Sequence, residues 1–86
     1  MMNITIDCSS IHTRQDLHRI FAEALSFPGW YGNNLDALHD CLTSVSGTIR
    51  LTNWDAAEAR LGNYGLAAKR AIAAAALENA DLEIIL

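Results

Sequence analysis

The stretch FPGWYGNNLDALHDCL, residues 27–42, contains the turn and the helix around which the rest of the chain can be placed. Its Pro and Gly residues end the element that precedes it, and an Asn-Asn pair then supplies a helix N-cap. The leucines that follow repeat at helical spacing and form one apolar stripe: Leu35, Leu38 and Leu42. We therefore predict a loop followed by an amphipathic helix opened by Asn33 or Asn34.

Two aspartates of this helix, Asp36 and Asp40, lie one turn apart on a face separate from the leucines. None of the residues three or four positions from Asp40 is Lys or Arg. Like charges at this spacing cost an isolated helix about 0.2–0.5 kcal/mol. The helix macrodipole stabilises Asp36 in the first turn, but its effect has faded at Asp40. We interpret Asp40 as a candidate binding residue, with a solvated surface acid as the alternative.

Two aromatic residues, Trp30 and Tyr31, stand in the loop just before this helix, between two glycines. Large amphipathic rings beside desolvated charges are typical of binding hot spots. Either ring could instead fold back onto the core, as we expect for Trp54 at the end of a predicted strand. The loop and the helix together predict a surface that binds another protein.

Working outward, alternating apolar residues predict strands over about 2–7 and 48–53, and DLEIIL at 81–86 closes the chain as a third strand. Further helices are expected over about 14–25, from a cap at Asn53 or Asp55 through Arg60, and over about 66–79, with a loop at 61–65. Strands separated by helical crossovers pair in parallel. The order predicts an α/β fold, a small three-stranded parallel sheet flanked by about four helices, in one domain over 1–86.

The net charge of −4, with only six Lys and Arg scattered along the chain, argues against direct nucleic-acid binding. An acidic protein is instead steered toward a basic partner. The longest apolar stretch, 71–77, is too short to span a bilayer, and the start of the chain does not resemble a signal peptide. We therefore expect a cytoplasmic protein with no membrane association. Cys8 and Cys41 are then expected to be reduced thiols, although spacing alone leaves a disulfide open.

A catalytic or metal-binding role for the same residues is disfavoured by geometry. A carboxylate pair divides acid and base roles only inside a cleft, which a helix face on so small a domain does not provide. His39 lies about 100° from Asp40 and about 60° from Asp36 around a helix, so three ligands would not converge. His12 and His18 are interpreted as isolated surface residues. We predict no enzyme activity, no cofactor and no metal.

The 27–42 stretch closely resembles the barstar family of ribonuclease inhibitors, and the likeness extends over essentially the whole chain. It includes the preceding amphipathic helix, the strand ending at Trp54 and the closing DLEIIL. The resemblance implies an antidote that blocks the active site of a basic extracellular ribonuclease, one to one, and that is monomeric when free. Asp40 would enter the phosphate-binding site of the enzyme and Asp36 would meet guanidinium groups at its rim. Trp30 would pack on the enzyme.

The resemblance also implies roles for neighbouring positions. Tyr31 matches an aromatic nearer the inhibitor's own core, and the other matches at or beside the interface are Gly32, Asn34 and Thr43. Four positions depart from the best-known member: His39 replaces a Trp, Ser44 a Gly, Val45 an aromatic and Ala74 an acid. His39 and Ser44 remain in the expected partner-binding set. Because the surrounding contacts change, the alternative is an adaptor that binds another basic protein, not a nuclease, through the same acidic helix.

Overall fold

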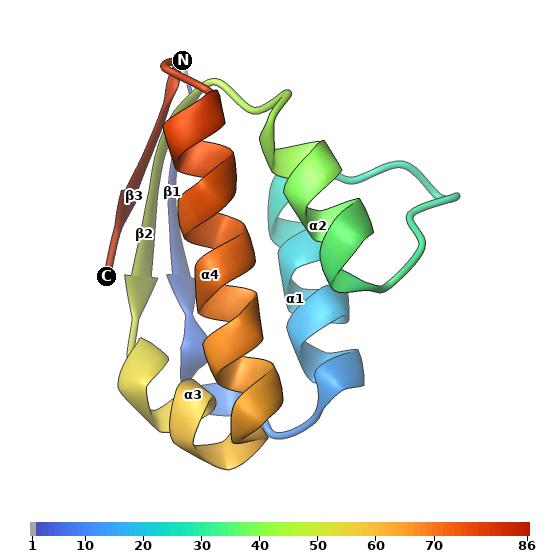
Figure 1. Cartoon of the computed structure of the whole chain (residues 1–86), viewed down its shortest axis with the longest axis vertical. Helices are drawn as coiled ribbons and strands as arrows, with labels where there is room; N and C mark the ends of the chain where they lie inside the picture. Colours follow the sequence, from blue (N-terminus) through green and yellow to red (C-terminus); the bar gives the residue numbers. More distant parts are fainter. Residues whose placement is uncertain (1) are drawn as a thin grey trace.

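The computed structural model describes residues 2–86 and contains the predicted order of strands and helices (Figure 1). The elements are β1 (Met2–Asp7), the 3-10 helix η1 (Cys8–Ser10), α1 (Arg14–Leu25), α2 (Leu35–Leu42), β2 (Gly47–Thr52), α3 (Trp54–Leu61), α4 (Asn63–Glu78) and β3 (Leu82–Ile85). The predicted bounds of β1 and α1 are confirmed at both ends, whereas η1 was not predicted. Within the described residues, no helix is both long and apolar enough to cross a membrane.

The three strands form one parallel sheet in the order β1-β2-β3, so the predicted α/β fold is confirmed. Met2 of β1 pairs with Gly47 of β2, which in turn pairs with Leu82 of β3. The sequence left this lateral order open. Both crossovers join neighbouring strands, which is the commonest arrangement for consecutive elements. The central strand β2 therefore connects the two halves of the chain.

The long helices cover only one face of this sheet. Figure 1 shows the sheet nearly edge-on, with α1, α2 and α4 on one side and α3 at its end. Along β2, Ile49 and Leu51 point inward and are buried, whereas Arg50 between them is exposed. Parallel sheets are usually buried on both faces. Here the open face carries the polar side chains that alternate with the buried apolar ones. The strands therefore show an alternating apolar and polar pattern in the sequence although they are parallel.

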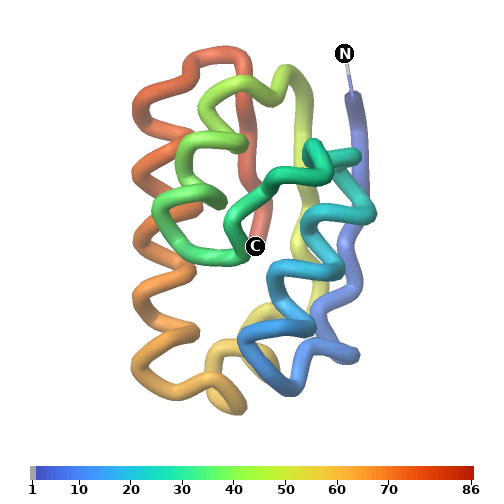
Figure 2. Tube along the Cα trace, turned by 90° about the vertical axis from the view of Figure 1, so that its right-hand side faces the viewer, coloured from blue at the N-terminus to red at the C-terminus, as the bar shows by residue number. Residues whose placement is uncertain are grey.

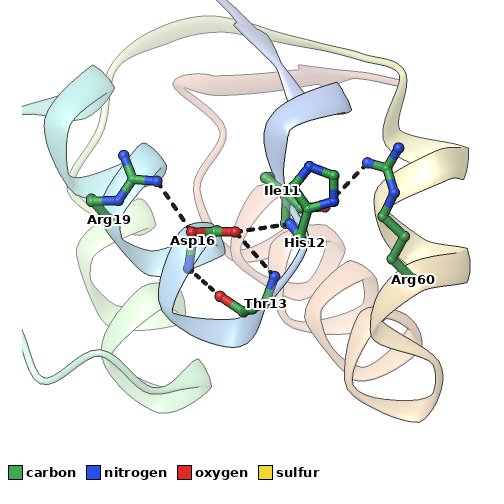
Figure 3. Close-up of polar contacts among 6 residues, drawn as sticks. All are labelled: Ile11, His12, Thr13, Asp16, Arg19 and Arg60. Atoms are coloured by element: carbon green, nitrogen blue, oxygen red, sulfur yellow. Dashed lines mark hydrogen bonds and ion pairs between the residues drawn. The ribbon is translucent and has the colours of Figure 1, made fainter.

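The start of α1 is held by a capping box formed by Thr13 and Asp16 (Figure 3). The Thr13 hydroxyl accepts the Asp16 amide at 3.1 Å, and the Asp16 carboxylate accepts the amides of His12 at 3.0 Å and Thr13 at 3.2 Å. Arg19 also pairs with this carboxylate at 3.2 Å. These bonds lower the pKa of Asp16, the His12 amide contributing most. The cap thereby fixes the direction in which α1 leaves the sheet.

The predicted loop at 61–65 is wrong: α3 ends at Leu61 and α4 begins at Asn63, so Gly62 alone separates them. The second glycine of that segment, Gly65, lies inside α4 rather than in a loop. A Cβ atom there would lie 2.6 Å from the carbonyl oxygen of Glu58 on α3. Gly65 therefore marks a close crossing of two helices, which a local sequence signal does not distinguish from a turn.

The buried side chains form one cluster between the sheet and the helices. Leu38 and Leu42 of the leucine stripe are fully buried, as is Trp54, which confirms its assignment to the core. Both thiols are free, with Cys8 buried and Cys41 half-buried. Burial raises the pKa of Cys8 to about 11, so this thiol stays protonated at neutral pH.

Candidate partner-binding surface

Helix α2 is held at both ends by polar side chains next to the acids. Of the two predicted caps, the structure uses Asn34, whose Oδ1 accepts the Ala37 amide at 2.8 Å. Its Nδ2 donates to the carbonyl of Gly32 at 3.2 Å, which closes the preceding turn. At the other end, the Thr43 hydroxyl donates to the carbonyl of Asp40 at 2.6 Å. Gly32, Asn34 and Thr43 thus set the position of the helix and of the loop before it.

Asp36 and Asp40 both point into solvent from α2. The side chain of Asp40 is 83% exposed. In the part of the chain that the structure describes, neither carboxylate forms an ion pair with Lys or Arg. The two acids border different hollows, because Asp36 lines one with Arg14 and Tyr64 whereas Asp40 lines another with Trp30. The acidic face therefore presents two exposed carboxylates that have no Lys or Arg partner among the described residues.

The structure adds a contact that the sequence analysis missed, from His39 to a third acid. The imidazole lies between Asp40, with Nδ1 3.4 Å from Oδ1, and Glu78 at the end of α4, whose carboxylate meets Nε2. The hydrogen bond to Glu78, followed by that to Asp40, raises the pKa of His39. Figure 2 shows α2 and α4 side by side, as their extensive contacts require. Glu78 is thereby brought to the edge of the acidic face.

Trp30 lies in the loop between α1 and α2, and this loop is the cyan-to-green segment in Figure 2. Its side chain is 81% exposed, so the alternative in which it folds onto the core is excluded for the free protein. Beside it opens a groove of about 520 Å³ whose lining includes Phe27, Asp40, Ser44 and Val45. Trp30 from the loop and Asp40 and Ser44 from α2 and its C-terminal end thus border one hollow.

Tyr31 follows the other alternative and folds inward, with 7% of its surface exposed. Its hydroxyl bonds to Nδ1 of His18 at 2.7 Å, and Nε2 of His18 bonds to the hydroxyl of Tyr64 at 2.7 Å. The prediction that His18 is an isolated surface residue is therefore wrong, because its side chain is 2% exposed. The guanidinium of Arg14 covers the Tyr64 ring at 4.4 Å. This chain of bonds ties the loop between α1 and α2 to α1 and α4.

Burial lowers the pKa of His18, which predicts how stability varies with pH. A neutral imidazole donates to one tyrosine and accepts from the other, whereas the charged form makes both hydroxyls accept inside the protein. The unfolded chain, with an ordinary His pKa of about 6.5, binds more protons at low pH. The free energy of unfolding should therefore fall as pH drops below about 6.5, by up to about 1.4 kcal/mol per pH unit.

Urea unfolding of wild type and His18→Gln between pH 5 and 7.5 measures this effect. The variant is expected to be less stable throughout but to lack the His18 part of the pH dependence. His39 contributes with the opposite sign, because its raised pKa favours folding at low pH, and it is present in both proteins. Equal slopes in the two proteins would contradict the role of His18.

Residues 2–86 contain no group of three His, Cys, Asp or Glu side chains arranged to hold a metal ion. The family described as Barstar (barnase inhibitor) matches residues 1–85, which include the sheet, α2 and the loop between α1 and α2. Over 67 residues, covering 74% of each chain, the sequence is 39% identical to a Bacillus subtilis (strain 168) protein named "Putative ribonuclease inhibitor YrdF". Both similarities concern proteins named for the inhibition of a ribonuclease.

Proposed function

Since this chain belongs to the barstar family of barnase inhibitors, we propose that it inhibits a basic ribonuclease by covering the enzyme's active site with α2 and the preceding loop. Asp40 is the central contact of this proposal, with Asp36 and Trp30 on either side. The margin of the proposed contact surface would be formed by Gly32, Asn34, Thr43 and Ser44. Tyr31, whose ring is buried, would support the loop from the protein core. The protein is an inhibitor and not an enzyme, and its action requires no cofactor.

The observation that carries the proposal is the state of Asp40. Its carboxylate is 83% exposed, has no Lys or Arg partner among the described residues and borders the same groove as the exposed ring of Trp30. A free carboxylate beside a large ring suits a partner that buries both. The repulsion among the acids of α2 is then relieved by that partner.

A ribonuclease active site supplies the cations that such a surface needs. Its Arg, Lys and His side chains are already arranged around the phosphates of RNA, and a carboxylate presents two oxygens of similar charge. Hydrogen bonds between charged groups are shorter and roughly twice as strong as neutral ones, and Arg meets a carboxylate through two of them. Asp40 would therefore occupy the position of a substrate phosphate.

We extend the proposal to the assembly and its location. One copy of the chain, acting as one domain over residues 1–86, would bind one nuclease molecule, because a single α2 fills a single active site. The free protein would be a monomer. It would act in the cytoplasm, where it protects the cell from the nuclease before that enzyme is exported.

Titration of this protein into barnase during RNA cleavage tests the proposal. Inhibition that is complete at one equivalent is expected, and Asp36→Ala/Asp40→Ala should abolish it at the same concentration. The control for loss of a surface acid is Asp55→Ala, which removes one exposed aspartate at the start of α3. If barnase is unaffected, immobilised wild type and double variant should be compared for captured proteins. A captured basic protein without nuclease activity would establish the adaptor instead.

Salt dependence of the association rate provides a further prediction. Opposite charges steer the encounter, and the Debye length shortens from about 30 Å at 0.01 M salt to about 10 Å at 0.1 M. We expect the association rate with barnase to fall at least tenfold between these concentrations, with a smaller change in the dissociation rate. Stopped-flow tryptophan fluorescence measures both rates. An association rate that does not depend on salt would contradict electrostatic steering.

A further inference from the structure

We propose that His39 holds Asp40 and Glu78 together in the free protein, and that a basic ribonuclease which takes over these carboxylates expels a proton from the imidazole. The inference rests on the proposed function and concerns how the same surface responds to pH. His39 thus acts as a proton-linked clasp, by which we mean that its charged imidazole holds the carboxylates of Asp40 and Glu78. The cations of the partner compete with this imidazole for the same carboxylates.

The geometry places the imidazole between two carboxylates from different helices. Nδ1 lies 3.4 Å from Oδ1 of Asp40 on α2, and Nε2 meets Oε2 of Glu78 on α4. The imidazole is the least exposed of the three side chains, at 27%, against 83% for Asp40 and 59% for Glu78. Both ring nitrogens therefore face acceptors, an arrangement that only the charged imidazolium satisfies completely, because it donates from both.

The ends of the two helices are fixed to each other beside this contact. The side chain of Asn79, just after α4, donates to the carbonyls of Leu42 at 3.1 Å and Val45 at 2.7 Å. Glu78 therefore reaches His39 from a backbone that is already docked on α2. The link between α2 and β2 carries no ionisable side chain, and Asp81 in the turn after α4 forms no hydrogen bond or ion pair with the imidazole.

The charged groups that His39 meets are thus both acids, and they raise its pKa. A bound ribonuclease would replace this environment with Arg, Lys and His side chains paired to the same carboxylates. The acids would then be neutralised and positive charge would lie nearby, so the pKa of His39 would fall. Between the free and the bound value, binding releases a proton. By linkage, the dissociation constant decreases with rising pH in that window, by at most tenfold per pH unit, and levels off above it.

Calorimetric titration with barnase tests the release directly. The heat of binding is measured near pH 7 in phosphate and in Tris, whose ionisation enthalpies differ, so the difference counts the protons released. Wild type should release more protons than His39→Gln, and its affinity should gain more between pH 6 and 8. Histidines of barnase contribute equally to both titrations. Equal release from the two inhibitors would overturn the clasp while leaving inhibition intact, whereas failure of wild type to bind barnase would overturn inhibition of this enzyme, and the free protein alone would then decide the clasp.

A measurement on the free protein examines the clasp without any partner. The NMR titration of the His39 ring should shift to lower pH in Glu78→Gln and in Asp40→Asn, because each variant removes a carboxylate that raises the pKa of His39. Glu23→Gln, which removes an exposed acid from α1 that has no contact with His39, serves as the control and should leave the midpoint unchanged. A midpoint that does not move in Glu78→Gln would overturn the clasp.

Discussion

Asp40→Ala is expected to weaken binding to barnase by about 2–5 kcal/mol or more, a range drawn in part from the barnase–barstar complex itself. The dissociation constant should therefore rise from about 30-fold to several thousand-fold. The loss is large because the cations of the enzyme would be desolvated opposite a methyl group. Stability should be unchanged or slightly higher. Among residues 2–86, Asp40 has no cationic partner beyond His39, and Thr43 bonds to its backbone carbonyl, which the substitution keeps.

Two measurements on the same variant separate binding from folding. Calorimetry or inhibition kinetics gives the change in affinity, and urea unfolding gives the change in stability. Asp55→Ala provides a variant of equal net charge and should bind barnase nearly as wild type does. A variant at position 40 that unfolds more easily would show that Asp40 is structural. Unchanged affinity with unchanged stability would remove Asp40 from the interface.

Gly47→Ala is expected to cause the largest loss of stability among single methyl additions, more than about 3 kcal/mol. Gly47 begins the central strand with a φ of 135°, a backbone conformation that L side chains rarely adopt. An added Cβ would lie 1.9 Å from the carbonyl oxygen of Met2 on the neighbouring strand. Because the obstacle is backbone and not a flexible side chain, β1 would have to move away from β2. A small domain whose total stability is about 5–15 kcal/mol would be partly unfolded.

Two other glycines provide matched controls for this prediction. Gly29→Ala meets nothing within 4 Å and has no positive φ, so it should leave the urea midpoint nearly unchanged. Gly62→Ala also has free space, but its φ of 60° and ψ of −130° lie outside the left-handed helical region, so it should cost only the strain of that conformation, about 1–3 kcal/mol. If Gly47→Ala proved no worse than Gly62→Ala, the close packing of β1 against β2 at this point would be wrong.

Local patterns were sufficient for most of the fold. Ile4 and Ile6 alternate along a strand, and Leu35, Leu38 and Leu42 repeat along a helix, and both elements occur where these patterns place them. The segment around Gly62 was misassigned, because glycine marks both turns and close helix crossings. The exposure of one sheet face was likewise not foreseen. It depends on which side of the sheet each crossover takes, and no single residue determines that.

The candidate surface was predictable only where its residues are neighbours in sequence. Asp36 and Asp40 share a face of one helix, so helical periodicity alone placed them together. The contacts of His39 with Glu78 and of His18 with Tyr64 each join α4 to a distant helix. They depend on how α4 is rotated and how far it is shifted along its axis. An alanine-rich helix with few large side chains does not reveal either quantity in its sequence.

The position of α2 within the first crossover has a consequence for the order of events during folding. β1 and β2 are parallel neighbours, and the segment that joins them contains α1, α2 and the connection between these helices. The two ends of this segment must therefore come together before the two strands pair. Closing so long a loop costs conformational entropy before most of the stabilising packing contacts can form. Chains dominated by such non-local pairs therefore fold slowly. We therefore expect newly made chains to pass through a period in which α2, too short to be stable alone, is not yet fixed in place and, under the proposed function, inhibits nothing. Protection against a nuclease would then depend on inhibitor that has already completed folding, and not on the rate at which more is synthesised.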